Sequence, residues 1–142
     1  MKKEYFSPPT LYKSSIYSHA VKTGNIVFVA GQCSHTPDDT GPEPTLLPKI
    51  VGSGDPYVQA RQCYLNVKLA LEAAGATMRD VVKINTYSTH PDYRKILIDL
   101  RQEFFEPPYP ASTGVVVSSL YDPAALFEVE VIAVIDSDDK EK

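Results

Sequence analysis

Glu128 is the residue of this sequence best suited to acid–base chemistry. It lies in the segment 127–134, whose apolar residues alternate with Glu128 and Glu130 and predict a strand with both glutamates on one face. We expect partial burial there to raise the pKa of the Glu128 carboxyl group toward the range of a general acid or base. A carboxylate with only structural hydrogen bonds is an equally good interpretation of Glu128, and for Glu130 the structural interpretation is the better one.

Other residues with chemical potential have weaker support. Tyr17 is suited to stacking on a planar ligand or donating its hydroxyl, and equally to an ordinary place at an interface. No base stands at a spacing that would activate Ser112, so we do not expect it to be a nucleophile. Nothing cationic near Cys33 predicts a lowered thiol pKa. Three histidines are interpreted as polar structural residues, namely His19, His35 and His90.

The two cysteines predict neither a disulfide nor a metal site. Cys33 and Cys63 lie far apart, form no Cys-x-x-Cys pair and have no histidine at ligand spacing. Cys63 lies on the apolar stripe of a predicted helix and is expected to be a core thiol. The cysteines therefore indicate no zinc site.

These residues must be positioned by a strand-rich framework. An N-cap at Asp55 with Pro56 after it begins a helix, and Gly75 ends it. Alternation and turn signals predict strands at 17–22, 26–31, 81–88, 115–117 and 126–135, a hairpin turn at 23–25, a long surface loop at 36–54, and a second helix at 91–104.

The predicted sheet has one face for helices and a second face that is still apolar. Two helices can cover only one face. The apolar face of the last strand consists of Phe127, Val129, Val131, Ala133 and Ile135. The opposite face of that strand carries Glu128, Glu130, Ile132 and Val134. Together with Ile26, Phe28 and Ala30, or with their alternating neighbours, it has more apolar surface than a lone monomer usually exposes. We therefore expect a homo-oligomer.

Composition narrows the class of protein. The 142 residues suit one domain, and a net charge of −4 is not typical of a nucleic-acid binder. The start of the chain has no apolar signal region, and no apolar run reaches membrane-spanning length, so we expect a cytoplasmic protein with no membrane partner. The acidic cluster Asp136, Asp138 and Asp139 is interpreted as a solvated tail.

Several short segments, in order, resemble the RidA/YjgF family of enamine and imine hydrolases, also described as reactive intermediate deaminases or endoribonuclease L-PSP-like proteins. They are Tyr17 with the strand after it, Val27-Phe28-Val29-Ala30-Gly31-Gln32, Gly54-Asp55, Gln59-Ala60-Arg61-Gln62, Asn66, Leu71-Glu72-Ala73-Ala74-Gly75, Asp80-Val81-Val82-Lys83, Phe104-Phe105, Pro110-Ala111 and the strand 128–134. The resemblance implies a single domain over 1–142, with a core at about 17–135 and terminal extensions at 1–16 and 136–142. It also implies a chorismate-mutase-like α+β fold: a mixed sheet with two helices on one face, assembled as a homotrimer with pockets in clefts between subunits.

The resemblance further implies a set of pocket residues. Glu128 would be catalytic, and the substrate-binding positions would be Tyr17, Ala30, Gly31, Ser112, Thr113, Gly114 and Ile98. Gly114 and Ile98 stand where the family often has cysteine and asparagine. Where the family typically reads Pro-Ala-Arg-Ser, this chain has Ser112 in place of the arginine that clamps the substrate carboxylate.

The missing arginine leaves a choice of functions. Serine cannot replace charged hydrogen bonds worth about 1.5–3 kcal/mol, so carboxylated imines should bind poorly. Arg101, near Ile98, is the first replacement to test, although a solvated helix residue is the simpler interpretation. The first hypothesis is a hydrolase for an imine, enamine or related compound without that carboxylate, with water positioned by Glu128. It implies no metal and no cofactor. The second is a non-catalytic metabolite-binding or regulatory trimer. Ribonuclease activity ranks third, because an acidic chain without a catalytic histidine pair or a basic aromatic groove offers RNA little to hold.

Overall fold

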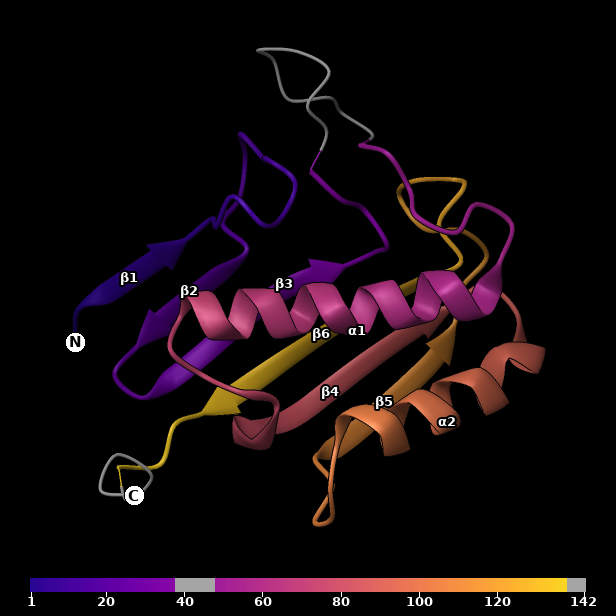
Figure 1. Ribbon diagram of the computed structural model, residues 1–142. Coiled ribbons are helices and arrows are strands. Elements are labelled where there is room, and N and C mark those ends of the chain that lie inside the picture. The colour runs from indigo at the N-terminus through magenta and orange to yellow at the C-terminus, as the bar shows by residue number, and fades with distance from the viewer. Residues whose placement is uncertain (38–47, 138–142) are drawn as a thin grey trace.

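The computed structural model describes residues 1–37 and 48–137 of the chain. Within these residues the chain forms six strands and two α-helices (Figure 1). The strands are β1 (Lys3–Phe6), β2 (Ala20–Thr23), β3 (Ile26–Gln32), β4 (Val81–Ser88), β5 (Ala111–Val116) and β6 (Phe127–Val134); the helices are α1 (Pro56–Ala73) and α2 (Arg94–Phe104). Two short 3₁₀ helices, η1 (Met78–Asp80) and η2 (Pro91–Tyr93), precede β4 and α2.

The strands form one mixed sheet in the order β1-β2-β3-β6-β4-β5. Neighbouring strands are antiparallel except β4 and β5, which are parallel and therefore need a crossover connection. That connection contains α2, and Figure 1 shows α1 and α2 on the same side of the sheet. The predicted α+β fold, a mixed sheet with two helices on one face, is confirmed.

Helix α1 begins and ends where the sequence predicts. The Asp55 carboxylate accepts a hydrogen bond from the backbone N–H of Val58 at 3.1 Å, and Pro56 occupies the first turn. Gly75 has φ 81°, the left-handed conformation that glycine adopts easily after a helix. The 23–25 turn is confirmed as well, since β2 and β3 pair around it up to Thr23 and Ile26.

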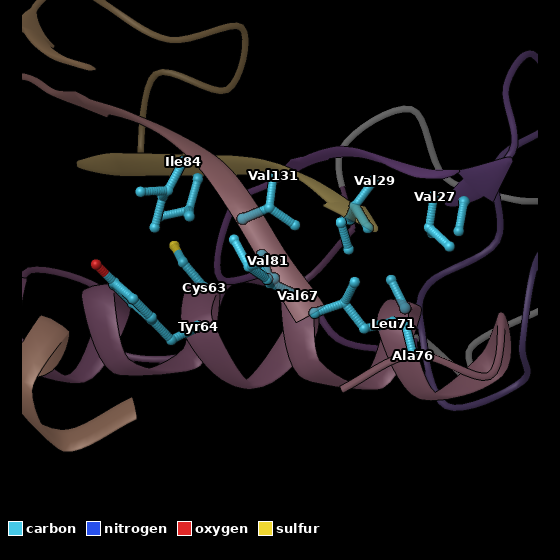
Figure 2. Close-up of a cluster of buried hydrophobic side chains, with 14 of the residues drawn as sticks. Val27, Val29, Cys63, Tyr64, Val67, Leu71, Ala76, Val81, Ile84 and Val131 are labelled. Carbon is cyan, nitrogen blue, oxygen red and sulfur yellow. The ribbon is translucent and has the colours of Figure 1, made fainter. Parts of the chain in front are cut away.

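The core lies between α1 and the sheet (Figure 2). Val67 and Leu71 on α1 pack toward Val29 and Val131 on the strands, and all four side chains are buried. Cys63 is also fully buried, and its thiol donates to the carbonyl of Phe127 at 3.6 Å, as expected for a core cysteine. The apolar face of β6 predicted from the sequence is buried throughout.

Residues 1–16, expected as an extension outside the core, belong partly to the fold. They supply strand β1, which pairs with β2, and the buried side chain of Leu11. The segment Lys3–Phe6 has no apolar run or clear alternation, so its pairing with β2 is not visible in the sequence.

Two strand boundaries differ from the prediction. β2 begins at Ala20 rather than at Tyr17, because the chain before it folds back and the His19 ring lies 2.6 Å from the carbonyl oxygen of Tyr12. β5 begins at Ala111 rather than at Val115. The small residues at its start have weak strand propensity, and pairing with β4 makes them a strand.

Part of the predicted 36–54 loop and of the acidic tail (38–47, with Asp138 and Asp139) lies outside the described residues. No helix in the described part of the chain is long and apolar enough to cross a membrane.

The described residues leave part of the second face of the sheet uncovered. Strand pairing aligns Tyr5, Val21, Phe28 and Ile132 in one row across β1, β2, β3 and β6. Phe28 is 46% exposed, and β5 is exposed along its whole length at the sheet edge. The sequence predicts more apolar surface on this face than a lone monomer usually exposes, and the exposed Phe28 side chain agrees with that prediction.

Candidate functional site

A β-bulge at the end of β3 shapes the first candidate site. Val29 pairs with Val131 and Gln32 with Val129, so β3 holds one more residue than β6 over this stretch. Because the two strands are antiparallel, the end of β3 lies beside the start of β6, where Glu128 is found. The bulge therefore brings Gly31 to the Glu128 side chain.

Gly31 lies directly against the Glu128 carboxylate. A Cβ atom at position 31 would overlap Oε1 of Glu128 and lie 2.8 Å from its Cδ. Real Cβ atoms do not approach a carbon atom so closely, so the absence of a side chain at Gly31 makes room for the carboxylate.

The surroundings of Glu128 change its acidity. Burial, with a smaller contribution from the negative charge of Glu130, raises the pKa of the Glu128 carboxyl group above its ordinary value, and His35 acts in the opposite direction. The direction agrees with the expectation from the sequence. No hydrogen bond to this carboxylate comes from the residues the structure describes. A half-buried carboxylate that accepts no hydrogen bond from the described residues is suited to holding water.

Glu130 has a different role although it lies on the same face. Its Oε1 accepts hydrogen bonds from Nδ2 of Asn85 at 3.0 Å and from the hydroxyl of Tyr87 at 2.7 Å. These contacts tie β6 to β4, and they agree with the structural role predicted for Glu130.

A pocket of about 440 Å³ opens at Glu128. Four residues predicted from the family resemblance line it together, namely Tyr17, Ala30, Gly31 and Glu128. The ring centroid of Tyr12 lies 6.4 Å from that of Tyr17 and 5.2 Å from that of His35, both edge-on. Burial, then Cys33 and Glu128, raise the pKa of Tyr17 to about 12, so its hydroxyl keeps its proton and can donate at neutral pH.

Cys33 lines the same pocket but is not poised as a nucleophile. Burial, with added effects from Glu128 and Asp122, raises the pKa of its thiol to about 12. The thiol therefore stays protonated, in line with the lack of a cationic neighbour in the sequence.

A second pocket, of about 670 Å³, lies between α2 and β5. It collects the predicted residues Ser112, Gly114 and Ile98. Two arginines also line it, Arg94 and Arg101, and its lining contains no aspartate or glutamate. The pocket is therefore positively charged even though Ser112 is neutral.

Arg101 contacts two aromatic residues of the core. Its Nε donates to the hydroxyl of Tyr64 at 3.5 Å, and its guanidinium carbon lies 6.0 Å from the ring centroid of Phe105. It is therefore not the freely solvated helix residue of the simpler interpretation. It lines the pocket next to the predicted position Ile98.

The two pockets do not meet within one chain. Ser112 pairs with the buried Ile84, whereas Glu128 pairs with Tyr87 on strand positions of the opposite face. Thr113, also predicted to line the pocket, is on the Glu128 face but lines neither pocket, and its Oγ1 accepts a hydrogen bond from Nζ of Lys83 at 2.7 Å.

Sequence reasoning missed the pair His35 and Asp122. Nε2 of His35 donates to Oδ2 of Asp122 at 2.9 Å, and both residues line the Glu128 pocket. The one signal in the sequence is topological: His35 follows β3, Asp122 precedes β6, and antiparallel neighbours bring those two loops together. Among the described residues no group of three or more histidine, cysteine or acidic residues is arranged to hold a metal ion.

Known proteins match this chain over nearly its whole length. The family model described as Endoribonuclease L-PSP matches residues 10–135. The 2-iminobutanoate/2-iminopropanoate deaminase of Dermatophagoides farinae is 33% identical over 120 residues, which cover 84% of this chain and 86% of that protein.

Solved structures are similar in fold as well. The Rid-family protein YyfA of Yersinia pestis has a TM-score of 0.82 at 29% identity and covers 94% of this chain and 100% of its own. TdcF of Escherichia coli, solved with bound serine, has a TM-score of 0.76 at 28% identity and covers 95% and 100%.

Proposed function

This chain belongs to the Endoribonuclease L-PSP family, which includes the RidA/YjgF proteins, and from that membership we propose that it hydrolyses an imine or enamine to a carbonyl compound and ammonia. The observation that carries the proposal is the half-buried Glu128 carboxylate, which packs on Gly31 in a pocket that Tyr17 also lines. A relative described as a 2-iminobutanoate/2-iminopropanoate deaminase supports the reaction class.

Glu128 acts on water in this proposal. Its carboxylate accepts a hydrogen bond from a water molecule and takes a proton as the water oxygen attacks the imine carbon. The raised pKa of Glu128 makes its carboxylate a stronger base than an ordinary glutamate. Tyr17 packs against the planar substrate and donates its hydroxyl.

The complete site needs a second copy of the chain. Ser112, Gly114 and Ile98 lie in a pocket apart from Glu128 within one chain, and the apolar second face of the sheet is uncovered. We propose a homotrimer in which the α2–β5 pocket of one subunit closes on the Glu128 pocket of its neighbour. Backbone groups at Ser112 and Gly114 would then anchor the substrate.

The preferred substrate lacks the carboxylate of amino-acid imines, because Ser112 offers a hydroxyl where an arginine would bind that group with two charged hydrogen bonds. Arg101 is the competing anchor, since it lines the same pocket as Ser112. Only the second alternative predicts that an Arg101 substitution weakens the binding of carboxylated imines.

A turnover assay tests the reaction class. Ammonia release is measured from imines generated in situ, one carboxylated series from amino acids and one neutral series from amines. We expect turnover of the neutral series, and Glu128→Gln should lower kcat by about 10²–10⁴-fold because the general base is lost. Unchanged turnover in Glu128→Gln would exclude this mechanism.

The same assay, run with Arg101→Gln, tests the substrate charge. The control is Arg61→Gln, because Arg61 also lies over an aromatic ring, at 5.7 Å from the Phe104 centroid, but lines neither pocket. We expect poor turnover of carboxylated imines by the wild type and no selective effect of Arg101→Gln. Efficient turnover of these imines, with a KM raised about tenfold or more by Arg101→Gln alone, would show that Arg101 holds the carboxylate.

A non-catalytic metabolite-binding trimer is the alternative function, and TdcF with bound serine is a relative that holds a small molecule. Thermal-shift screening of neutral and anionic ligands separates the hydrolase from the binding protein. Stabilisation by a ligand without any imine turnover would favour the binding protein. Ribonuclease activity remains third, because the described histidines form no pair: His19 is buried, His35 bonds to Asp122, and His90 lies at the start of η2.

A further inference from the structure

His35 and Asp122 form a buried pair beside Glu128 that water activation does not use. Their hydrogen bond measures 2.9 Å, and the two side chains are 9% and 8% exposed. Both line the same pocket of about 440 Å³ as Glu128. Burying an ionisable pair costs desolvation free energy, so a gain in stability is a weak explanation for the presence of the His35–Asp122 pair.

The fold fixes this imidazole from several sides. Asn66 of α1 donates to the carbonyl oxygen of His35 at 2.7 Å, and His35 forms a β-bridge with Ile50. The ring of Tyr12 meets the imidazole edge-on at 5.2 Å. Asp122 is held in turn, because its Oδ1 accepts the backbone N–H of Ala124 at 2.9 Å. The pair is therefore oriented before any ligand arrives.

The hydrogen bond also fixes the roles of the two ring nitrogens. A carboxylate only accepts, so Nε2 of His35 carries a hydrogen, and Nδ1 is the nitrogen left to face a ligand. In the described part of the chain, no hydrogen bond occupies Nδ1. A histidine whose second nitrogen is fixed by a carboxylate is a common arrangement for proton transfer in enzymes.

We propose that His35, oriented by Asp122, is a second acid–base residue of this pocket and gives a proton to the nitrogen of the bound imine while Glu128 takes one from water. The proposal rests on the proposed function. The titratable groups that line the pocket together with His35 are Glu128 of β6, Tyr121 and Asp122 of the loop before it, Cys33 after β3, and Tyr12, Lys13 and Tyr17 of the segment before β2.

The proton transfers balance over one turnover. In the first step the water oxygen bonds to the imine carbon, Glu128 takes a water proton, and the C=N π electrons move to nitrogen, which takes the Nδ1 proton of the His35 imidazolium. In the second step the C–N bond breaks, nitrogen leaves as ammonia with the proton from Glu128, and the hydroxyl proton returns to His35 as the carbonyl forms. Imine and water give carbonyl and ammonia, and both residues return to their starting states.

The test compares His35→Asn and Asp122→Asn with His90→Asn. His90 is the matched control, because it forms a histidine–aspartate contact with Asp92 at 3.5 Å on the surface, with side chains 55% and 86% exposed, and asparagine keeps its N-cap. The readouts are ammonia release as a function of pH, melting temperature, and the ¹⁵N signals of His35 in the assembled protein.

We expect His35→Asn to lower kcat about 100-fold and to remove the alkaline fall of the pH–rate profile, since the imidazolium is the acid. Asp122→Asn should lower kcat about tenfold and move the His35 ¹⁵N signals toward the other tautomer. His90→Asn should change neither. Unchanged kcat and pH profile in a folded His35→Asn protein, or unchanged ¹⁵N signals in Asp122→Asn, would overturn the proposal while the proposed function stands.

Absence of imine turnover in the wild type would instead overturn the proposed function and this role with it. If His35→Asn does not fold, Asp122→Asn decides alone, because it keeps the size of the side chain and the contact with Ala124.

Discussion

At the scale of single residues, surroundings separate two glutamates that the sequence places on one face. Glu130 is held by Asn85 and Tyr87, whereas Glu128 lies against Gly31 with its carboxylate open to the pocket. Burial raises the pKa of the Glu128 carboxyl group, because fewer water molecules stabilise its charge. The same half-buried position puts the carboxylate in the lining of the pocket.

Gly31→Ala tests whether this close approach positions the Glu128 carboxylate. The new Cβ would overlap Oε1 of Glu128, so the carboxylate must swing out of place, and we expect imine turnover to fall about tenfold or more with a modest loss of stability. Turnover and melting temperature are measured in Gly31→Ala, Glu128→Ala and the double variant.

The double variant supplies the control for that prediction. Once Glu128 is truncated, alanine at position 31 meets no carboxylate, so Gly31→Ala should have little further effect in the Glu128→Ala protein. Equal effects of Gly31→Ala with and without the Glu128 side chain would show that glycine is needed for the backbone at position 31 and not for the carboxylate.

The sequence predicts Glu128 better than it predicts its neighbours. Alternation along 127–134 is enough to place Glu128 away from the helices, and the structure agrees. His35 and Asp122 belong to loops, where no periodicity constrains a side chain, and only the pairing of β3 with β6 brings them together. Thr113, a pocket residue according to the resemblance, lies on the Glu128 face, and its hydroxyl accepts a hydrogen bond from Lys83.

At the scale of elements, the segment before β2 is held in place by a buried histidine. Nε2 of His19 donates to the carbonyl oxygen of Tyr12 at 2.6 Å, and Nδ1 accepts from Nε2 of Gln32 at 3.0 Å. His19 is fully buried, and the same segment carries Tyr12 and Tyr17 into the pocket wall. The strand prediction for 17–22 failed at its start because these side-chain contacts, which have no periodic signature, compete with strand pairing.

Acidification should release this segment. Burial lowers the pKa of His19 below its ordinary value, so the unfolded chain binds the proton first as the pH falls. The stabilising contribution is present above the ordinary histidine pKa of about 6.5 and is lost as the pH falls toward the lowered value, at no more than about 1.4 kcal/mol per pH unit. We expect a lower melting temperature at pH 5 than at pH 7.5.

His19→Gln is the variant that isolates this effect. It should be less stable than the wild type at pH 7.5, yet lose less stability between pH 7.5 and pH 5, because its side chain does not titrate. His90→Asn should keep the wild-type pH dependence, since His90 is exposed. A pH dependence in His19→Gln as steep as in the wild type would assign the effect to other groups.

At the scale of the whole molecule, the two faces of the sheet differ in what packs against them. Both helices cover one side of the sheet, and the other side carries the row of Tyr5, Val21, Phe28 and Ile132, in which Tyr5 and Phe28 are exposed. This asymmetry was predictable, because two helices and a sheet with two apolar faces can be read from the sequence. The separation of Ser112 from Glu128 follows from the same geometry, since the two residues lie on opposite faces and in different pockets.

Phe28→Lys tests whether the sheet face that carries Phe28 is the assembly surface on which the complete site depends. We expect the wild type to have three times the mass of one chain by light scattering after size exclusion. A lysine in the apolar row should dissociate it into monomers, because its charge would lose water on assembly. Imine turnover should fall with the loss of the assembly, since Ser112 and Glu128 could no longer meet.

Tyr57→Lys is the matched control, since Tyr57 and Phe28 are both 46% exposed but Tyr57 lies in the first turn of α1, on the helix side. It should leave mass and turnover unchanged. A monomeric wild type with full turnover would mean that one chain completes the site alone. If Phe28→Lys stayed trimeric, the subunits would have to meet on another surface, and the α2–β5 pocket would no longer be expected to close on the Glu128 pocket of a neighbour.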